Sequence, residues 1–152
     1  MEIISLSGVK PTTLDAVDIA SLDTIGNAHR PLGIKVDGAT HADMLIPHLD
    51  TLSLIEINFK AFTDGRGFSL AYRLRRDHGF NGEIRISGPV MPDQAHMLLR
   101  TGADTLVLEI PERKDAFLTA LKRFGAYYQN SINDDVAVSF QRHQPQNQKV
   151  AS

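Results

Sequence analysis

Residues 52–69 read LSLIEINFKAFTDGRGFS, and this stretch decides the fold class. Its first part, Leu52 to Phe59, carries apolar side chains on both faces, which is typical of a buried strand. The second part holds an acid, a base, hydroxyls and two glycines, and it leads into an amphipathic helix predicted over Gly67 to His78. We expect Gly65 and Gly67 to permit a positive φ and close backbone approach. A strand, a glycine-bearing loop and a helix start form the arrangement in which α/β proteins usually place a site.

The same alternation of strand and helix continues on both sides of this stretch. The predicted strands are Leu32 to Val36, Leu52 to Asn58, Glu83 to Ser87 and Thr105 to Ile110. The predicted helices run from Thr40 to about Ile46, from Gly67 to His78, from Pro92 to Gly102 and from Pro111 to Phe124. This order predicts a single α/β domain over residues 32–132, with an open, mainly parallel sheet of about four to five strands. Four strands are too few to close a barrel, so the expected shape is a half-barrel or three layers.

The two ends of the chain are predicted to lie outside this core. Residues 1–31 form an N-terminal arm, with a short strand or arm at Ile3 to Leu6 and a weakly patterned helix over Pro11 to Leu22. In residues 133–152, the alternation from Val136 to Phe140 suggests one extra strand, which pairs with the sheet edge of another subunit in one interpretation. The polar, glutamine-rich end of the chain is predicted to be disordered or to order on a partner.

The composition excludes several classes of protein. The 152 residues include no cysteine, which rules out disulfides, thiolate nucleophiles, cysteine-ligated iron–sulfur clusters and cysteine zinc sites. A net charge of −2 gives no indication of nucleic-acid or membrane partners. The start of the chain lacks the basic and apolar regions of a signal peptide, and no apolar run approaches the roughly 18 residues of a membrane span. We therefore expect a cytoplasmic protein.

No cofactor or metal is predicted. The glycines at 65 and 67 lack the third glycine of a dinucleotide-binding loop, and no phosphate-binding P-loop motif occurs in the chain. No carboxylate completes a metal-binding trio with the scattered histidines. These histidines are His29, His41, His48, His78, His96 and His143.

The candidate site lies beyond the carboxyl ends of the strands, where the loops of an open parallel sheet gather. The candidate binding residues are Lys60, Thr63, Asp64, Gly65, Arg66, Gly67, Ser69, Gly88, Asp93 and Gln94. Lys60 and Arg66, next to free helix N–H groups, favour an anion such as phosphate, sulfate, sulfite or a carboxylate. Asp64 and Arg66 are the candidate catalytic residues.

A structural role for the same loop stays open. Asp64 and Gly65 form a common turn pair, so the Asp64 carboxylate has a place in an Asx-turn. Ser69 is then an ordinary first-turn hydroxyl. Arg66 pairs with Asp64 or Asp93 and only locks two loops together.

Several sequence blocks resemble a bacterial family of unknown function whose members are commonly described as probable oxidoreductases involved in sulfite reduction. The blocks are Phe62 to Ser69, Arg73 to Arg75, Gly79 to Arg85, Gly88, Asp93-Gln94, Gly102 to Asp104 and Tyr127 to Gln129. The resemblance covers about residues 32–130. It implies a role in assimilatory sulfur metabolism, because members of the family are found beside sulfite reductase.

Three functional interpretations follow. The first is an accessory protein that supports sulfite reductase or its electron-transfer partners without its own redox centre, since the chain has no evident group to carry electrons. The second is a small enzyme or anion-binding protein that uses the Asp64–Arg66 loop. The third is a structural module that forms a homo-oligomer, such as a homodimer, by covering an open sheet edge.

Overall fold

Six strands form one sheet in the computed structural model, which describes residues 2–18, 32–124, 127 and 129–132. The strands are β1 (Glu2–Ser5), β2 (Ala16–Asp18), β3 (Leu32–Asp37), β4 (Leu52–Asn58), β5 (Glu83–Ser87) and β6 (Thr105–Leu108). The α-helices of the described residues are α2 (Arg66–Arg76), α3 (Ala95–Arg100) and α4 (Lys114–Leu121). Short 3₁₀ helices are η2 (Ala42–Met44), η3 (Ile46–His48), η4 (Pro92–Gln94) and η5 (Pro111–Arg113).

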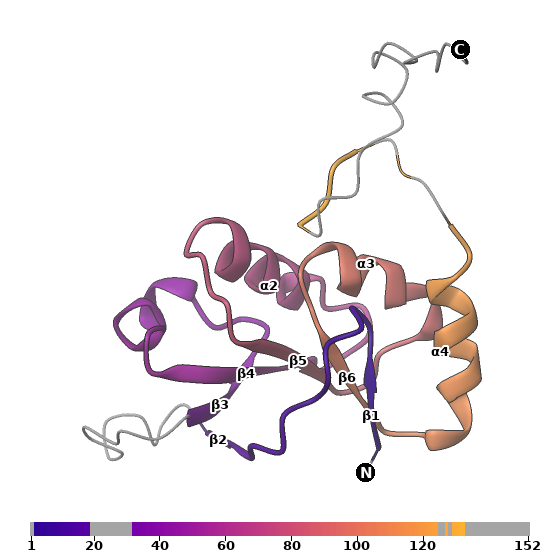
Figure 1. The fold of residues 1–152 in the computed structure, drawn as a ribbon, viewed down its shortest axis with the longest axis horizontal. Coiled ribbons are helices and arrows are strands. Elements are labelled where there is room, and N and C mark those ends of the chain that lie inside the picture. Colours follow the sequence, from indigo (N-terminus) through magenta and orange to yellow (C-terminus); the bar gives the residue numbers. More distant parts are fainter. Residues whose placement is uncertain (1, 19–31, 125–126, 128, 133–152) are drawn as a thin grey trace, which may run out of the picture.

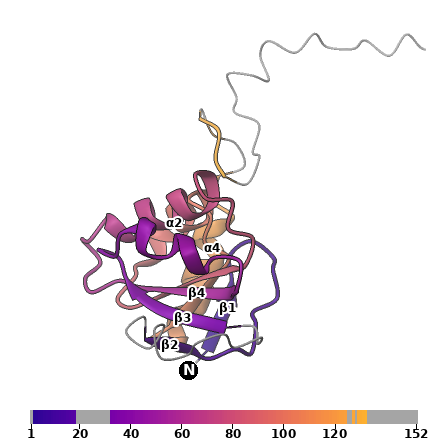
Figure 2. The same ribbon diagram turned by 90° about the vertical axis from the view of Figure 1, so that its left-hand side faces the viewer.

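The sheet is open and mostly parallel, as predicted. Its order is β1-β6-β5-β4-β3-β2, so β2 to β6 follow one another across the sheet in chain order. These five strands are parallel, and β1 pairs with β6 in the antiparallel direction. Crossovers between neighbouring parallel strands are almost always right-handed, which puts the helices that connect β3 to β6 on the same face. Figures 1 and 2 show α2 and α4 over one side of the sheet, which is the arrangement of a half-barrel and not of three layers.

One hydrophobic core fills the space between the sheet and the helices. In β3 to β6, alternate side chains point into it, and Ile34, Ile55 and Ile84 form one row across the sheet in register. The next row holds Val36, Ile57, Ile86 and Leu106. The helices complete the core with buried residues, which are Leu70, Ala71, Leu74, Ala95, Leu98, Phe117 and Ala120.

The opposite face of the sheet is polar and carries charges of alternating sign. In one register row, Asp18 lies beside Lys35, which lies beside Glu56, then Arg85 and Thr105. Glu56, an unusual residue for a buried strand, therefore faces away from the core. The described helices leave this face free, and the chain between β1 and β2 runs across it instead (Figure 1).

The helix after β4 matches its prediction closely. It begins at Arg66, one residue earlier than expected, and Gly79 follows it with a φ of +62°, as expected for a residue that ends a helix. Leu70 and Leu74 face the core as predicted. His78 lies beyond the end of the helix.

Three other local predictions are wrong. The stretch from Thr40 to Ile46 forms η2 and then η3 in place of an α-helix, because Pro47 cannot donate the backbone hydrogen bond that would continue one. Over Pro11 to Leu22, the described residues include no helix, since β2 pairs with β3 there. Phe124 is 56% exposed and does not face the core, because α4 ends at Leu121. The strand predicted at Val136 to Phe140 and the polar tail lie outside the described residues.

Candidate functional site

The loops that follow β4 and β5 are locked against each other at the carboxyl edge of the sheet. Phe59 N–H donates to the Ser87 carbonyl at 2.8 Å, and Gln94 Nε2 donates to the Phe62 carbonyl at 2.8 Å. Gly88 has a φ of +101°, and a Cβ atom there would lie 2.1 Å from the Phe59 carbonyl oxygen. Only glycine fits this position, so Gly88 and Gln94 have a structural role in joining the two loops, and their role in binding stays a prediction.

The two glycines of the quoted loop act differently from each other. A Cβ on Gly67 would lie 2.5 Å from the Phe59 ring, so its absence lets the start of α2 pack on β4. Gly38 also lies against the start of α2, because a Cβ atom added to Gly38 would lie 2.9 Å from Gly67 N. Gly65 has a φ of −73° and open space around it, and neither position 65 nor position 67 adopts a positive φ. The close approach that glycine permits is present at Gly67.

Asp64 and Arg66 form a two-point ion pair within the loop. Arg66 Nε donates to Asp64 Oδ1 at 2.8 Å, and Arg66 Nη2 donates to Asp64 Oδ2 at 2.7 Å. The Arg66 backbone N–H also donates to Asp64 Oδ1 at 3.2 Å, which is the Asx-turn that the sequence left open. Hydrogen bonds from Arg66 lower the pKa of Asp64 to about 2, and the carboxylate raises the pKa of Arg66. Asp64 is therefore ionised at neutral pH and is poorly suited to general acid–base catalysis, which favours a pKa near the working pH.

Lys60 and Asp37 form a second pair beside the first. Lys60 Nζ lies 2.5 Å from Asp37 Oδ2, and Asp37 Oδ1 accepts a hydrogen bond from the Ala39 N–H at 2.6 Å. The hydrogen bond from Lys60 and then the one from Ala39 lower the pKa of Asp37. Together the four side chains of Asp37, Lys60, Asp64 and Arg66 make a loop cluster of two fixed anions and two fixed cations at the ends of β3 and β4.

The remaining predicted site residues do not join the loop cluster. Thr63 and Ser69 are exposed, and no side-chain hydrogen bond is formed by either within the described residues. Asp93 borders a separate hollow that it shares with Asp115 and Arg123 of the α4 region. Arg66 therefore pairs with Asp64, and the alternative pairing with Asp93 is wrong.

A family model described as a bacterial protein of unknown function (DUF934) matches residues 33–139. The chain belongs to this family. No curated protein and no solved structure matches it. The match confirms the bacterial family of unknown function, whereas the role in sulfite reduction stays a prediction.

In this family member, several of the recognised sequence blocks meet far from the candidate site, at the amino ends of the strands. Arg75 on α2 pairs with Asp104 and donates to the carbonyls of Phe80, Gly82 and Gly102. Burial lowers the pKa of Arg75, although Asp104 opposes that shift. Arg75 is therefore a packed residue and not part of a solvated helix face, because its side chain is only 14% exposed.

A second buried ion pair holds the N-terminal chain on the polar face of the sheet. Arg85 Nε donates to Glu83 Oε1 at 3.0 Å, and Thr105 Oγ1 donates to the same oxygen at 2.6 Å. The same two side chains also bind the backbone of the N-terminal chain. Arg85 donates to the carbonyls of Thr12 and Leu14, and the Thr12 N–H donates to Glu83 at 2.7 Å. These family residues therefore have a structural explanation that requires no ligand.

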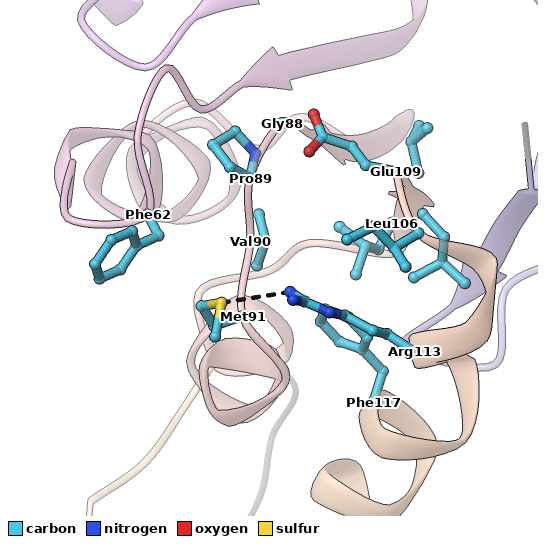
Figure 3. A pocket seen from close by; sticks show the side chains of 12 residues that line it. Phe62, Gly88, Pro89, Val90, Met91, Leu106, Glu109, Arg113 and Phe117 are labelled. Carbon is cyan, nitrogen blue, oxygen red and sulfur yellow. Dashed lines mark hydrogen bonds between the residues drawn. The ribbon is translucent and has the colours of Figure 1, made fainter.

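A cavity that the sequence pattern did not predict lies next to the loop cluster. It measures about 150 Å³ and lies at the carboxyl ends of β5 and β6 (Figure 3). Its lining is Phe62, Gly88, Pro89, Val90, Met91, Leu106, Val107, Leu108, Glu109, Ile110, Arg113 and Phe117. Phe62, in the loop between β4 and α2, is the part of this lining that lies in the quoted stretch of sequence.

Nothing in the described ranges gathers three potential metal ligands of the histidine, cysteine, aspartate or glutamate type. Of the six histidines, His29 and His143 lie outside these ranges. Among the helices in the part of the chain that the structure describes, none has the length and apolar character to cross a membrane.

Proposed function

We propose that this protein is an accessory protein of assimilatory sulfite reduction, which supports sulfite reductase without carrying a redox centre of its own. The proposal starts from the resemblance of the sequence blocks to a family found beside sulfite reductase. It is also supported by the chemistry of the chain, because none of its 152 residues is a cysteine and no nicotinamide or nucleotide motif occurs.

The observation that most favours a binding role over catalysis is the pairing inside the loop cluster. Both oxygens of Asp64 accept hydrogen bonds from Arg66, and the pKa of the carboxyl is about 2. A carboxylate held in this state takes up no proton at neutral pH, whereas a charged surface suits recognition of a partner. We place the partner surface at the carboxyl edge of the sheet, where the loop cluster and the cavity adjoin.

Affinity capture from cells grown on sulfate tests the partner. We expect sulfite reductase, or a protein that delivers electrons to it, to be retained by the wild-type protein and not by a variant that carries Asp64→Asn and Arg66→Gln. The purified protein should show no visible absorbance of its own. Equal retention of sulfite reductase by wild type and variant would place the partner surface elsewhere, and absence of both prey proteins would contradict the proposal.

A second candidate function is binding of a small anion at the start of α2. Arg66 and Lys60 lie there beside the first-turn N–H groups of an 11-residue helix, which favour negative charge. An anion would have to compete with Asp64 for Arg66, so we expect weak binding in the wild type and stronger binding in Asp64→Asn. Titration with sulfite and with sulfate, followed by NMR of the Gly67 and Ser69 amides, distinguishes this candidate from partner binding.

A further inference from the structure

The cavity at the ends of β5 and β6 has the size and lining of a binding pocket for one apolar group. Its volume is about 150 Å³, and a cavity of that size lined by apolar side chains accommodates a benzene molecule. The walls come from Val90, Leu106 and Phe117. A leucine or phenylalanine side chain therefore fits.

The rim of this pocket is apolar and exposed. Phe62 is 55% exposed, Met91 is 39% exposed and Ile110 is 44% exposed, and all three border the cavity. They come from three different loops, so this apolar rim is built by the fold and not by one stretch of sequence. Large apolar side chains gathered at one point on a surface commonly mark a binding site.

Arg113 supplies a free cation at the same place. Its Nη1 atom contacts Met91 Sδ at 3.6 Å, and no carboxylate of the described residues lies within ion-pair distance of it. Figure 3 shows the guanidinium beside Met91 and near Phe117, below Val90 of the loop that follows β5. A guanidinium without a carboxylate partner is able to bind a carboxylate through two hydrogen bonds.

Glu109 provides an acceptor on another side of the cavity. Figure 3 shows its carboxylate near Gly88, across the cavity from Arg113. Glu109 is exposed, and no hydrogen bond of its side chain is formed within the described residues. A ligand that carries an N–H group, a carboxylate and an apolar side chain on one carbon atom would therefore meet an acceptor at Glu109, a donor at Arg113 and an apolar pocket.

We propose that this cavity binds an apolar α-amino carboxylate, that is, a leucine- or phenylalanine-like group that carries a carboxylate for Arg113 and an N–H for Glu109. Two sources share this chemistry: a free apolar amino acid, and the last residue of a polypeptide that ends in an apolar side chain. The proposal goes beyond the role in sulfite reduction and does not depend on it.

Titration of the full chain with N-acetyl-leucine, followed by amide NMR, tests the site. We expect saturable shifts in Gly88 to Met91 and in Glu109 to Phe117. N-acetyl-leucinamide, which lacks the carboxylate, should bind roughly tenfold more weakly or worse, because a charge-assisted pair is lost. Absence of saturable shifts up to roughly 10 mM, or equal binding of acid and amide, would overturn the proposal.

Matched variants assign the contacts. Arg113→Gln should remove the preference for the acid over the amide, whereas Arg123→Gln, an exposed arginine just beyond α4, should leave it unchanged. Glu109→Gln should weaken binding, and Glu112→Gln, outside the cavity, should not. All four positions are exposed, so folding is expected to survive each change. An unchanged preference in Arg113→Gln would contradict the assignment.

The same measurement separates the two sources. Tighter binding of leucine than of N-acetyl-leucine favours a free amino acid, because the ammonium group then adds a charge pair with Glu109. Tighter binding of a peptide that ends in leucine favours a polypeptide C-terminus. Either result supports binding of an apolar α-amino carboxylate. Neither result is expected if the cavity is only a packing irregularity at the edge of the core.

Discussion

Replacing Arg75 with methionine removes the side chain that ties α2 to the amino edge of the sheet. Arg75 donates to the carbonyls of Gly102 at 3.0 Å, Phe80 at 2.5 Å and Gly82 at 2.8 Å, and it forms an ion pair with Asp104. Methionine keeps the aliphatic stem but leaves three carbonyls without this donor. It also leaves the Asp104 carboxylate, which is 15% exposed, without its cation.

The expected loss of stability is large for a single substitution. Removal of one partner from a buried ion pair typically costs about 3–5 kcal/mol. Some water reaches these side chains, and the Ile84 N–H still donates to Asp104 at 2.9 Å, so we expect about 3 kcal/mol here. The matched control is Arg73→Met on the same helix, whose ion pair with Asp77 is exposed and 3.8 Å long, and we expect a change of about 0–1 kcal/mol.

Urea denaturation of both variants, monitored by far-UV circular dichroism, measures the difference. The double variant Arg75→Met, Asp104→Asn should be less destabilised than the sum of the two single variants, because the uncompensated charge is gone. A loss below roughly 1 kcal/mol in Arg75→Met, or equal losses at positions 73 and 75, would refute the assignment of Arg75 to a structural role.

Other predictions concern the loops at the carboxyl edge. Arg66→Lys should melt close to the wild-type temperature but fail to support growth on sulfite, because lysine keeps the charge and loses the planar guanidinium. A large fall in melting temperature would show that the pair of Asp64 and Arg66 has a structural role. The Asp64 carboxyl should titrate near pH 2 by NMR. The pKa of Asp64 in the folded protein lies below its unfolded value of about 3.9, so its contribution to stability is present above pH 4 and is lost as the pH falls towards 2. A titration midpoint of Asp64 near the unfolded value would exclude the ion pair in solution. Gly88→Ala should destabilise the fold strongly through its φ of +101° and the 2.1 Å approach to the Phe59 carbonyl, whereas Gly65→Ala should not, and thermal melting compares the two.

The parts of the fold that depend on local sequence pattern were predictable. Each of the four strands from β3 to β6 has a run or an alternation of apolar residues between turn signals, and the helices between them left parallel pairing as the simplest topology. The end of α2 followed from Gly79, because a positive φ at that point suits glycine. The ion pair of Asp64 and Arg66 was one of the stated alternatives, since the two residues lie in one turn.

The parts that depend on distant contacts were not predictable. β1 and β2 are only 4 and 3 residues long, and their place in the sheet is set by pairing with β6 and β3 and not by their own pattern. Arg75 reads as an exposed helix residue until Asp104 is brought beside it. The cavity likewise forms only where the loops after β4, β5 and β6 meet, so no single stretch of sequence marks it.

Growth of a deletion strain is the most direct test of the accessory role in sulfite reduction. In a strain with no second copy of the gene, we predict poor growth with sulfate or sulfite as sole sulfur source and normal growth with cysteine. Expression of the wild-type chain should restore growth on sulfite, and Arg66→Lys should not. Normal growth of the deletion strain on sulfite would contradict the proposed function.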